Sequence, residues 1–312
     1  MARYILHLIE RGLIMAKTFS TAEKEILNMF TTGTSFKYDG KDYVVDLSGK
    51  PTCSKGEPKT DIYIKAKSSC NDYKEFKISF KKENAEFLEN KTNAERAEQL
   101  FGEFWSSIIS NATSNLRNDF LSRTLIYKKK IGKTDAGAIT LGWKFELLTV
   151  PSGHLSGNMQ LTREQVIDVY AGTNLTGDKR DSSVNGMTIS NSGVANFILV
   201  QNQPIQNAQQ AINSLISIED YVNQNPDVYF ACKALNYRSF KHKYDGNRPL
   251  AVYVDWSVNN GKLSHQICFD TPLQQGGNYA YERLKKALDQ LGIETTDDLN
   301  EENVEYPDNM YE

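Results

Sequence analysis

Cysteine, histidine and proline are all scarce in this chain, and each shortage excludes a class of protein. The 312 residues include four cysteines, four histidines and eight prolines. No two cysteines form a Cys-x-x-Cys pair, which argues against a disulfide scaffold and a ribbon-type zinc site and fits a reducing compartment, the cytoplasm. With 39% hydrophobic residues the chain is neither collagen-like nor disordered throughout, so it can bury a real core.

Long hydrophobic runs are missing as well. Residues 4–9 are apolar, but Glu10 and Arg11 follow before the run reaches the roughly 18 residues that a membrane span needs. We therefore expect no membrane partner and treat residues 1–19 as an N-terminal extension. No serine lies in a Gly-x-Ser-x-Gly elbow, and Tyr127 stands where a P-loop before Gly132-Lys133-Thr134 requires glycine.

Basic residues are absent from the C-terminal end. Residues 294–312 contain eight acidic residues and no lysine or arginine. With these eight set aside, the net charge of −3 becomes +5 for the remaining chain. A basic body followed by an acidic tail suits a protein that handles a polyanion, although such tails also serve solubility alone.

The hydrophobic pattern predicts an α/β protein of the α+β kind with a mixed sheet. Capping boxes at 20–23 and 92–95 begin a helix over about 20–30 and a long amphipathic helix through 109. Alternating residues predict β-hairpins at 36–47 and at 61–81. The remaining expected elements are strands at 121–126, 143–150, 227–232, 250–256 and 263–269 and helices at 206–223 and 280–291. We place a catalytic core at 20–150, a recognition region at 151–293 and the acidic tail at 294–312.

The second hairpin brings an acid and an amine together. With its turn centred near Cys70, opposite residues have numbers that sum to about 140, so Asp61 faces Ser79. Lys81 follows on the same face, because side chains two residues apart share a face. The alternative acid-x-Lys pair is Glu75-Phe76-Lys77, but Glu75 lies opposite residue 65, about 13 Å along the strand from Asp61. A carboxylate for Mg²⁺ and a lysine beside it are the groups that metal-assisted phosphodiester hydrolysis needs.

These residues resemble the PD-(D/E)xK nuclease superfamily. The matching stretches are Gly-Glu-Pro-Lys-Thr-Asp at 56–61 and Ile-Ser-Phe-Lys at 78–81, and the order helix, three strands, helix, strand is similar to the superfamily core. The resemblance implies that Asp61 and the carbonyl of Phe80 hold Mg²⁺ while Lys81 positions the attacking water. It departs at Ser79, where the superfamily places an acid. The missing charge is then expected from Glu57, or from Glu23 or Glu25 of the first helix.

Two further segments carry candidate DNA contacts. Lys82, Asn84 and Lys91 follow the hairpin, in a connection that is equally consistent with a solvated surface. Residues 233–248 form an expected basic loop with interleaved aromatic residues, which suits phosphate contacts as well as it suits an ordinary charged hairpin. Its expected DNA-binding residues are Arg238, Lys241, Lys243 and Arg248.

The function expected from these features is that of a Mg²⁺-dependent type II restriction endonuclease, which cleaves double-stranded DNA at a specific sequence. A cognate methyltransferase would then act in the same system, and monomer and homodimer both stay open. Two alternatives remain: a repair or defence nuclease on structured or modified DNA, and a non-catalytic DNA-binding protein in which Ser79 marks a decayed site.

Overall fold

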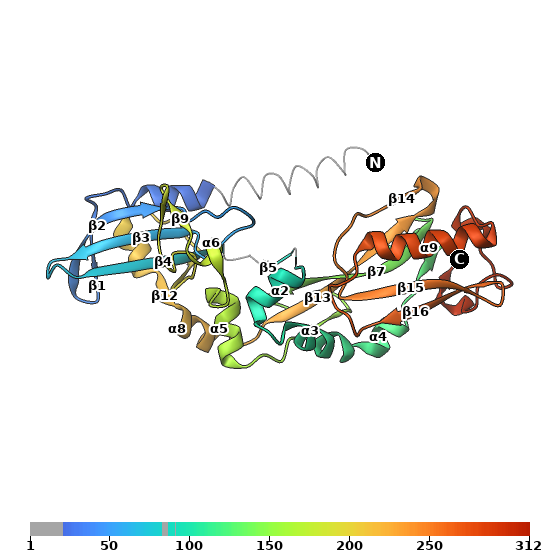
Figure 1. Cartoon of the computed structure of the whole chain (residues 1–312). Coiled ribbons are helices and arrows are strands. Elements are labelled where there is room, and N and C mark those ends of the chain that lie inside the picture. The colour runs from blue at the N-terminus through green and yellow to red at the C-terminus, as the bar shows by residue number, and fades with distance from the viewer. Residues whose placement is uncertain (1–20, 83–86, 91) are drawn as a thin grey trace. The chain divides into compact units, whose positions relative to one another are not determined.

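The computed structural model describes residues 21–82, 87–90 and 92–312, and these divide into two compact units (Figure 1). The first unit joins the described residues up to 82 to Thr162–Pro226, and the second joins the described residues between 87 and 161 to Asp227–Glu312. Each unit therefore draws on both halves of the sequence. The boundary expected between residues 150 and 151 does not separate them, because the first unit resumes after the chain has begun the second.

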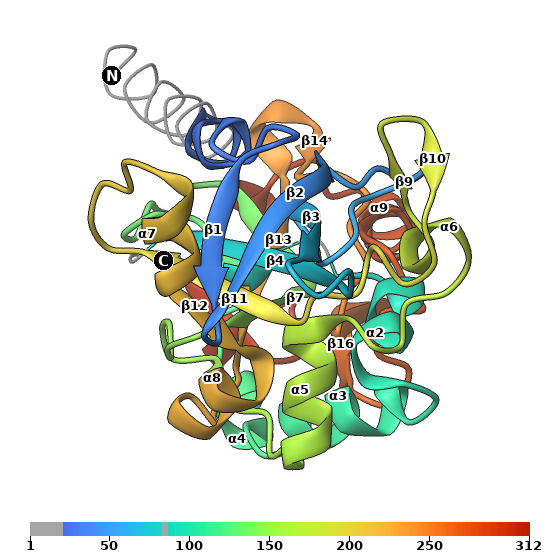
Figure 2. The ribbon, with the colours of Figure 1, turned by 90° about the vertical axis from the view of Figure 1, so that its left-hand side faces the viewer.

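A six-stranded mixed sheet organises the first unit, as Figure 2 shows from one side. Its strands follow the order β1-β2-β3-β4-β11-β12, and only the β4–β11 pair is parallel. The strand bounds are β1 Ser35–Tyr38, β2 Lys41–Gly49, β3 Ile62–Ser68, β4 Tyr73–Lys82, β11 Phe197–Gln201 and β12 Leu215–Ser217. A mixed sheet with helices confirms the α/β class expected from the sequence.

Both predicted hairpins of this sheet are confirmed. The β1–β2 turn uses Asp39 and Gly40, which adopt φ angles of 48° and 71°, as this turn requires. The β3–β4 pairing aligns Ile62 with Ile78 and Tyr63 with Lys77, so opposite residues sum to 140 as predicted. The register holds because one face of the hairpin is apolar, and a slip of one residue would expose that whole face.

An aromatic cluster forms the core beneath that face. Phe76 lies at its centre and packs edge-on against Phe36 at 5.5 Å and stacks on Phe197 at 5.6 Å between ring centroids. Each fully buried ring of this size contributes about 1.5–3 kcal/mol of hydrophobic stabilisation. Residues 21–28 form a helix that adds Ala22 and Ile26 to the same core, and Ser20 of its predicted capping box lies outside the described residues.

Short elements complete the first unit. The helix predicted at 206–223 is interrupted by β12, because Ser214 ends one helix and Ser217 caps the next. A capping box from Thr162 to Gln165 starts α5, and the left-handed Gly172 ends it. The bounds are α5 Arg163–Ala171, α6 Gly177–Arg180, β9 Ser183–Val184, β10 Met187–Thr188, α7 Ala208–Asn213 and α8 Ile218–Gln224.

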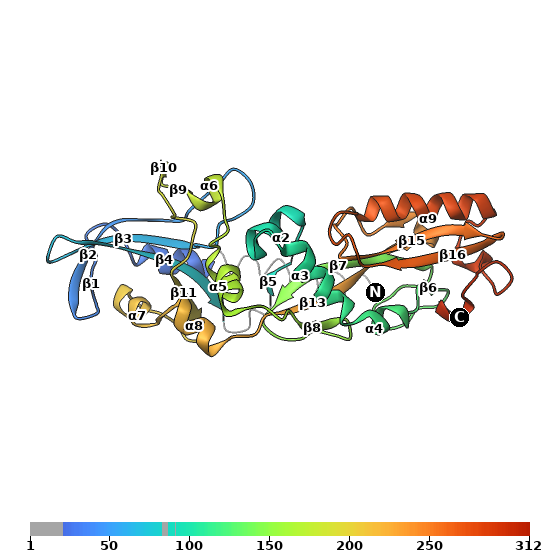
Figure 3. The same ribbon diagram turned by 60° about the horizontal axis from the view of Figure 1, so that its bottom comes forward.

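The second unit is built on a sheet with the central order β14-β13-β7-β15-β16, in which all neighbours pair antiparallel. Helix α9, Gly277–Leu291, runs along β15 and β16 (Figure 3), and Gly292 ends it at φ 67° as predicted. The strand bounds are β5 Phe87–Glu89, β6 Ile126–Tyr127, β7 Ala138–Leu148, β8 Ser156–Asn158, β13 Tyr229–Arg238, β14 Lys243–Tyr244, β15 Val252–Asn259 and β16 Lys262–Cys268.

Two sequence predictions in this unit are wrong. The long helix expected through 109 breaks at Gly102, whose φ of 72° ends α2, Ala94–Phe101, before α3, Trp105–Ser114, begins. Of the strand expected at 121–126, the first residue ends α4, Arg117–Leu121, the last begins β6, and the residues between them form no helix or strand. Neither helix nor strand joins the sheet of the first unit, so they are not part of a core around Asp61.

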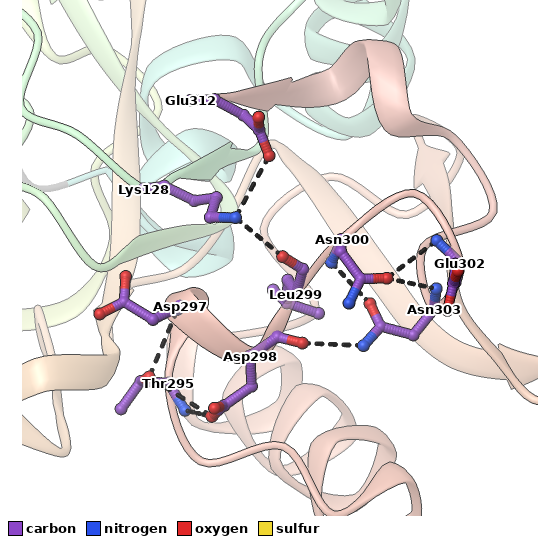
Figure 4. Close-up of polar contacts among 9 residues, drawn as sticks. All are labelled: Lys128, Thr295, Asp297, Asp298, Leu299, Asn300, Glu302, Asn303 and Glu312. Carbon is purple, nitrogen blue, oxygen red and sulfur yellow. Dashed lines mark hydrogen bonds and ion pairs between the residues drawn. The ribbon is translucent and has the colours of Figure 1, made fainter.

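The C-terminal segment folds against the second unit (Figure 4). Strand β17, Met310–Tyr311, pairs with β6, and the amine of Lys128 donates to the carbonyl of Leu299 at 3.0 Å and bridges to Glu312 at 3.2 Å. Short 3₁₀ turns at Thr296–Asp298 and Pro307–Asn309 precede the strand. The carboxylate of Asp298 accepts hydrogen bonds from the backbone amides of Glu294 and Thr295, so these acids have local structural roles.

Within the described part of the chain, every helix is either too short or too polar to cross a bilayer. The four cysteines are free thiols.

Candidate active site

Asp61 anchors the site at the open end of the β3–β4 hairpin. Its backbone amide donates to the carbonyl of Ile78 at 2.8 Å, and its carboxylate accepts a hydrogen bond from the backbone amide of Phe80 at 2.7 Å. The paired register of the hairpin begins at Ile62, and these two bonds attach Asp61, just before it, to the residues on either side of Ser79. The carboxylate is therefore held by the neighbouring strand.

The β4 strand presents Ser79 and Lys81 on the face that carries Asp61. Phe76, Ile78 and Phe80 enter the core on the other face, so the odd-numbered side chains point away from it. Ser79 is buried and Lys81 is half-buried. The amide and the carbonyl of one strand residue face the same edge, so the Phe80 carbonyl also faces the side on which Asp61 lies.

Lys77 shows why Lys81 is the better candidate of the two lysines on this face. The Lys77 amine donates to the carbonyl of Asn191 at 3.2 Å, and burial lowers its pKa. Glu75, on the same face, accepts a hydrogen bond from the hydroxyl of buried Tyr63. The alternative acid-x-Lys pair at 75 and 77 is therefore engaged in holding the structure.

A second acid and a second lysine complete the cluster. Glu23, on the helix at 21–28, forms an ion pair with Lys50 at 3.0 Å. Lys50 follows β2 directly after Gly49, which pairs with Tyr63, so it lies beside the start of β3. Although burial lowers the pKa of Lys50, the hydrogen bond and charge of Glu23 and the charges of Asp61 and Glu57 raise it overall. We call Glu23, Lys50, Asp61, Ser79 and Lys81 the acid–lysine cluster.

Burial and the neighbouring charges shift the pKa of Asp61. Burial raises it from 3.8 to about 6; the positive charge of Lys81 opposes that rise and the negative charge of Glu23 adds to it. The Phe80 amide and Lys50 lower it by smaller amounts. A buried carboxylate with a raised pKa between a second acid and two amines is a combination that functional sites often show.

The other predicted acids lie farther out. Glu25 is exposed on the helix, two residues beyond Glu23, and its side chain is therefore turned away from the half-buried side of Glu23. Glu57 is exposed and acts on Lys50 through its charge. Lys50 was not predicted from the sequence. It lies in Ser-Gly-Lys-Pro-Thr at 48–52, a segment whose residues indicate only that the strand ends there. The pairing of β2 with β3 is the signal that would have found it.

The DNA-contact candidates after the hairpin are only partly described. Lys82 ends β4 and pairs with Gln201 of β11. Asn84 and Lys91 lie outside the described residues.

The basic candidates at 238–248 belong to the second unit. Arg238 is on β13 rather than in a loop, and it pairs with Asp135 and, at 2.8 Å, with Asp245. Lys241 approaches Asp135 at 3.6 Å. Lys243 and Arg248 are exposed. The positive charge that this surface offers to a phosphate is therefore carried mainly by Lys243 and Arg248.

The donor set around Asp61 fits a hard divalent cation. The carboxylates of Asp61 and Glu23 and the carbonyl of Phe80 supply oxygen alone, which Mg²⁺ prefers. A bound cation would offset the burial and the repulsion by Glu23 that raise the pKa of Asp61. Across the described ranges, no group of three or more histidine, cysteine or acidic side chains is arranged to hold a metal ion. Mg²⁺ usually takes one or two carboxylates and completes its shell with water and substrate phosphates, so two acids suffice.

Comparisons with protein families, with curated proteins and with solved structures found no match to this chain.

Proposed function

We propose that this protein is a Mg²⁺-dependent endodeoxyribonuclease of the PD-(D/E)xK kind, most simply a type II restriction endonuclease acting on double-stranded DNA. The observation that carries the proposal is the acid–lysine cluster, in which the positive charge of Lys81 on β4 acts on the buried carboxylate of Asp61, which directly precedes β3. The element order of the first unit supports it. A helix, the β2–β3–β4 meander, α5 and the parallel strand β11 follow one another around the cluster.

The roles of the residues follow from their positions. Asp61, Glu23 and the Phe80 carbonyl would hold Mg²⁺, which supplies charge neutralisation at the scissile phosphate and acidifies water. Lys81 orients the attacking water by donating a hydrogen bond and offsets negative charge as the 3′ oxygen leaves in line. Lys50 holds the Glu23 carboxylate beside Asp61. We infer that the basic residues of the second unit contact the DNA backbone and that the protein acts in the cytoplasm.

Ser79 supports a second candidate function. It is a buried hydroxyl at the position where the PD-(D/E)xK pattern has an acid, so the site has one carboxylate fewer on β4. A protein with such a site binds DNA without cutting it if Glu23 does not replace that acid.

Cleavage of phage and plasmid DNA in Mg²⁺, with and without EDTA, distinguishes a restriction endonuclease from the alternative functions. Discrete fragments with a single mapped end sequence support a restriction endonuclease. Sedimentation of the protein then distinguishes a monomer from a homodimer. A smear, or cutting only at junctions or modified bases, supports a repair or defence nuclease. Binding without cutting in Mg²⁺ overturns the nuclease proposal in favour of the DNA-binding protein.

A further inference from the structure

A pocket of about 650 Å³ lies in the second unit. None of its lining residues belongs to the acid–lysine cluster or to the DNA-binding candidates. Its walls come from residues 123–134, from β7, from the segment 152–155 and from the stretch of β13 around Cys232. Pockets that bind small molecules generally measure about 300–1,000 Å³, so this one can enclose a ligand with a ring and a charged group.

The lining of the pocket is positively charged. Arg123, Lys133 and Lys233 contribute cationic groups, and no aspartate or glutamate lines it. The nearby buried acid Glu146 is bound to the amine of Lys144 at 2.6 Å. Burial raises the pKa of the Cys232 thiol, so the thiol stays neutral and adds no negative charge. The pocket therefore favours an anion.

The position of Lys233 is fixed by its neighbours. Its amine donates to the carbonyl and to the hydroxyl of Ser152, each at 3.1 Å. An ammonium group has three donors, so one remains to be directed at a ligand. A cation held in place in this way loses little side-chain entropy when it binds an anion.

The half-buried ring of Tyr127 adds a planar surface to the same pocket, and the buried Trp143 forms part of its wall. Trp143 packs edge-on against Phe120 with ring centroids 5.0 Å apart, and the Tyr127 hydroxyl donates to the carbonyl of Thr124 at 2.8 Å. Both rings are therefore held in place. Aromatic rings stack on nucleic-acid bases of any sequence, whereas cationic side chains bind phosphate.

We propose that this pocket binds a single nucleotide, with the base against Tyr127 and the phosphate at Arg123, Lys133 and Lys233. The nucleotide comes either as a free monophosphate or as one unit of a single strand whose base is turned out of the stack. The proposal does not require cleavage by the acid–lysine cluster, because every group it uses belongs to the second unit.

Calorimetric titration of the full chain in EDTA tests the proposal, because cleavage is then suppressed. The probes are adenosine and cytidine monophosphates, the nucleosides and inorganic phosphate. We expect the monophosphates to bind with a dissociation constant of about 1 mM or below, more tightly than either fragment alone. Arg123→Gln and Lys133→Gln should each weaken that binding about tenfold, the loss expected for a charge-assisted hydrogen bond.

Lys130→Gln is the matched control, because Lys130 is exposed in the same segment and does not line the pocket. Equal thermal unfolding midpoints for all variants exclude misfolding as the cause of weaker binding. Absence of monophosphate binding overturns the proposal, as does binding that neither variant weakens, or phosphate binding as tight as that of the nucleotide. Competition by a short single-stranded oligonucleotide assigns the pocket to a strand, and lack of competition assigns it to a free nucleotide.

Discussion

Lys81 and Lys77 lie on one face of β4 but have different roles. Lys81 acts on Asp61, whereas Lys77 is bonded to the loop carbonyl of Asn191. We predict that Lys81→Ala lowers the DNA cleavage rate at least about a hundredfold, the scale of a lost charge stabiliser or proton-handling group. DNA binding should stay within about tenfold of wild type.

The matched variant is Lys77→Ala, which should keep most of the cleavage rate while loosening the loop. Single-turnover cleavage and gel-shift titration, run side by side on both variants, give the comparison. Equal loss of cleavage in the two variants would show that the acid-x-Lys pair has been placed at the wrong register.

Asp61 should make the free energy of unfolding fall as pH rises, whereas most carboxylic acids in proteins make it rise. Its pKa is raised in the fold from 3.8 to about 6, so the folded protein holds this proton more tightly than the unfolded chain does. This contribution to the free energy of unfolding is complete below about pH 3.8 and is lost as pH rises through about 6. We predict that Asp61→Asn removes this fall.

Urea unfolding of wild type and Asp61→Asn at several pH values between 4 and 7 measures the difference in their free energies of unfolding. The contributions of the other titrating groups cancel in this difference. Parallel pH profiles would refute the assignment. Added Mg²⁺ should stabilise the wild type near neutral pH and leave Asp61→Asn unaffected.

At the scale of elements, the loop before β11 holds the strand end that carries Asp61. The carbonyl of Gly193 accepts hydrogen bonds from the amides of Lys59 and Thr60 at 3.0 and 3.2 Å. A Cβ on Gly193 would lie 1.8 Å from the carbonyl oxygen of Lys179. We predict that Gly193→Ala lowers the free energy of unfolding by at least about 1–3 kcal/mol, the cost of overpacking, and lowers cleavage with it.

Thr188→Ala is the control for that loop, because Thr188 is exposed on β10 and should change the free energy of unfolding by less than about 0.5 kcal/mol. Denaturant unfolding of both variants provides the test. Wild-type stability in Gly193→Ala would mean that the loop does not hold this segment.

The hairpins are the elements that the sequence predicts best. Local alternation and a short turn determine the register from Ile62 to Lys67, and Asp61 directly precedes it, bonded to Ile78 and Phe80 on either side of Ser79. The partner of β4 is harder to predict, because β11 lies more than a hundred residues along the chain. Segments that are neighbours in sequence usually pack together. For that reason the helices at 94–114 were expected in the core around Asp61, but they belong to the second unit. Lys50 was missed for a similar reason, since only the β2–β3 pairing places it near Asp61.

For the whole molecule, DNA binding should depend on charge that is not already paired. Lys243 and Arg248 are exposed, whereas Arg238 is held between Asp135 and Asp245. We predict that Lys243→Gln combined with Arg248→Gln lowers the slope of log affinity against log salt by about two, one for each phosphate contact.

Fluorescence anisotropy over a salt series measures that slope, with Lys286→Gln on the exposed side of α9 as the control. An unchanged slope in the double variant would remove this surface from the DNA interface. Arg238→Gln should alter the slope less and should lower stability, because it leaves Asp245 without its ion-pair partner and Asp135 with Lys241 alone.

Conversion of supercoiled plasmid to nicked and linear forms is the most direct test of the acid–lysine cluster as a nuclease site. The assay compares wild type, Asp61→Asn and the exposed-acid control Glu25→Gln, each in Mg²⁺ and in EDTA. We predict that wild type and Glu25→Gln cut the plasmid in Mg²⁺ but not in EDTA, and that Asp61→Asn cuts it in neither. Cutting by Asp61→Asn at the wild-type rate, or intact plasmid with wild type in Mg²⁺, would contradict this prediction.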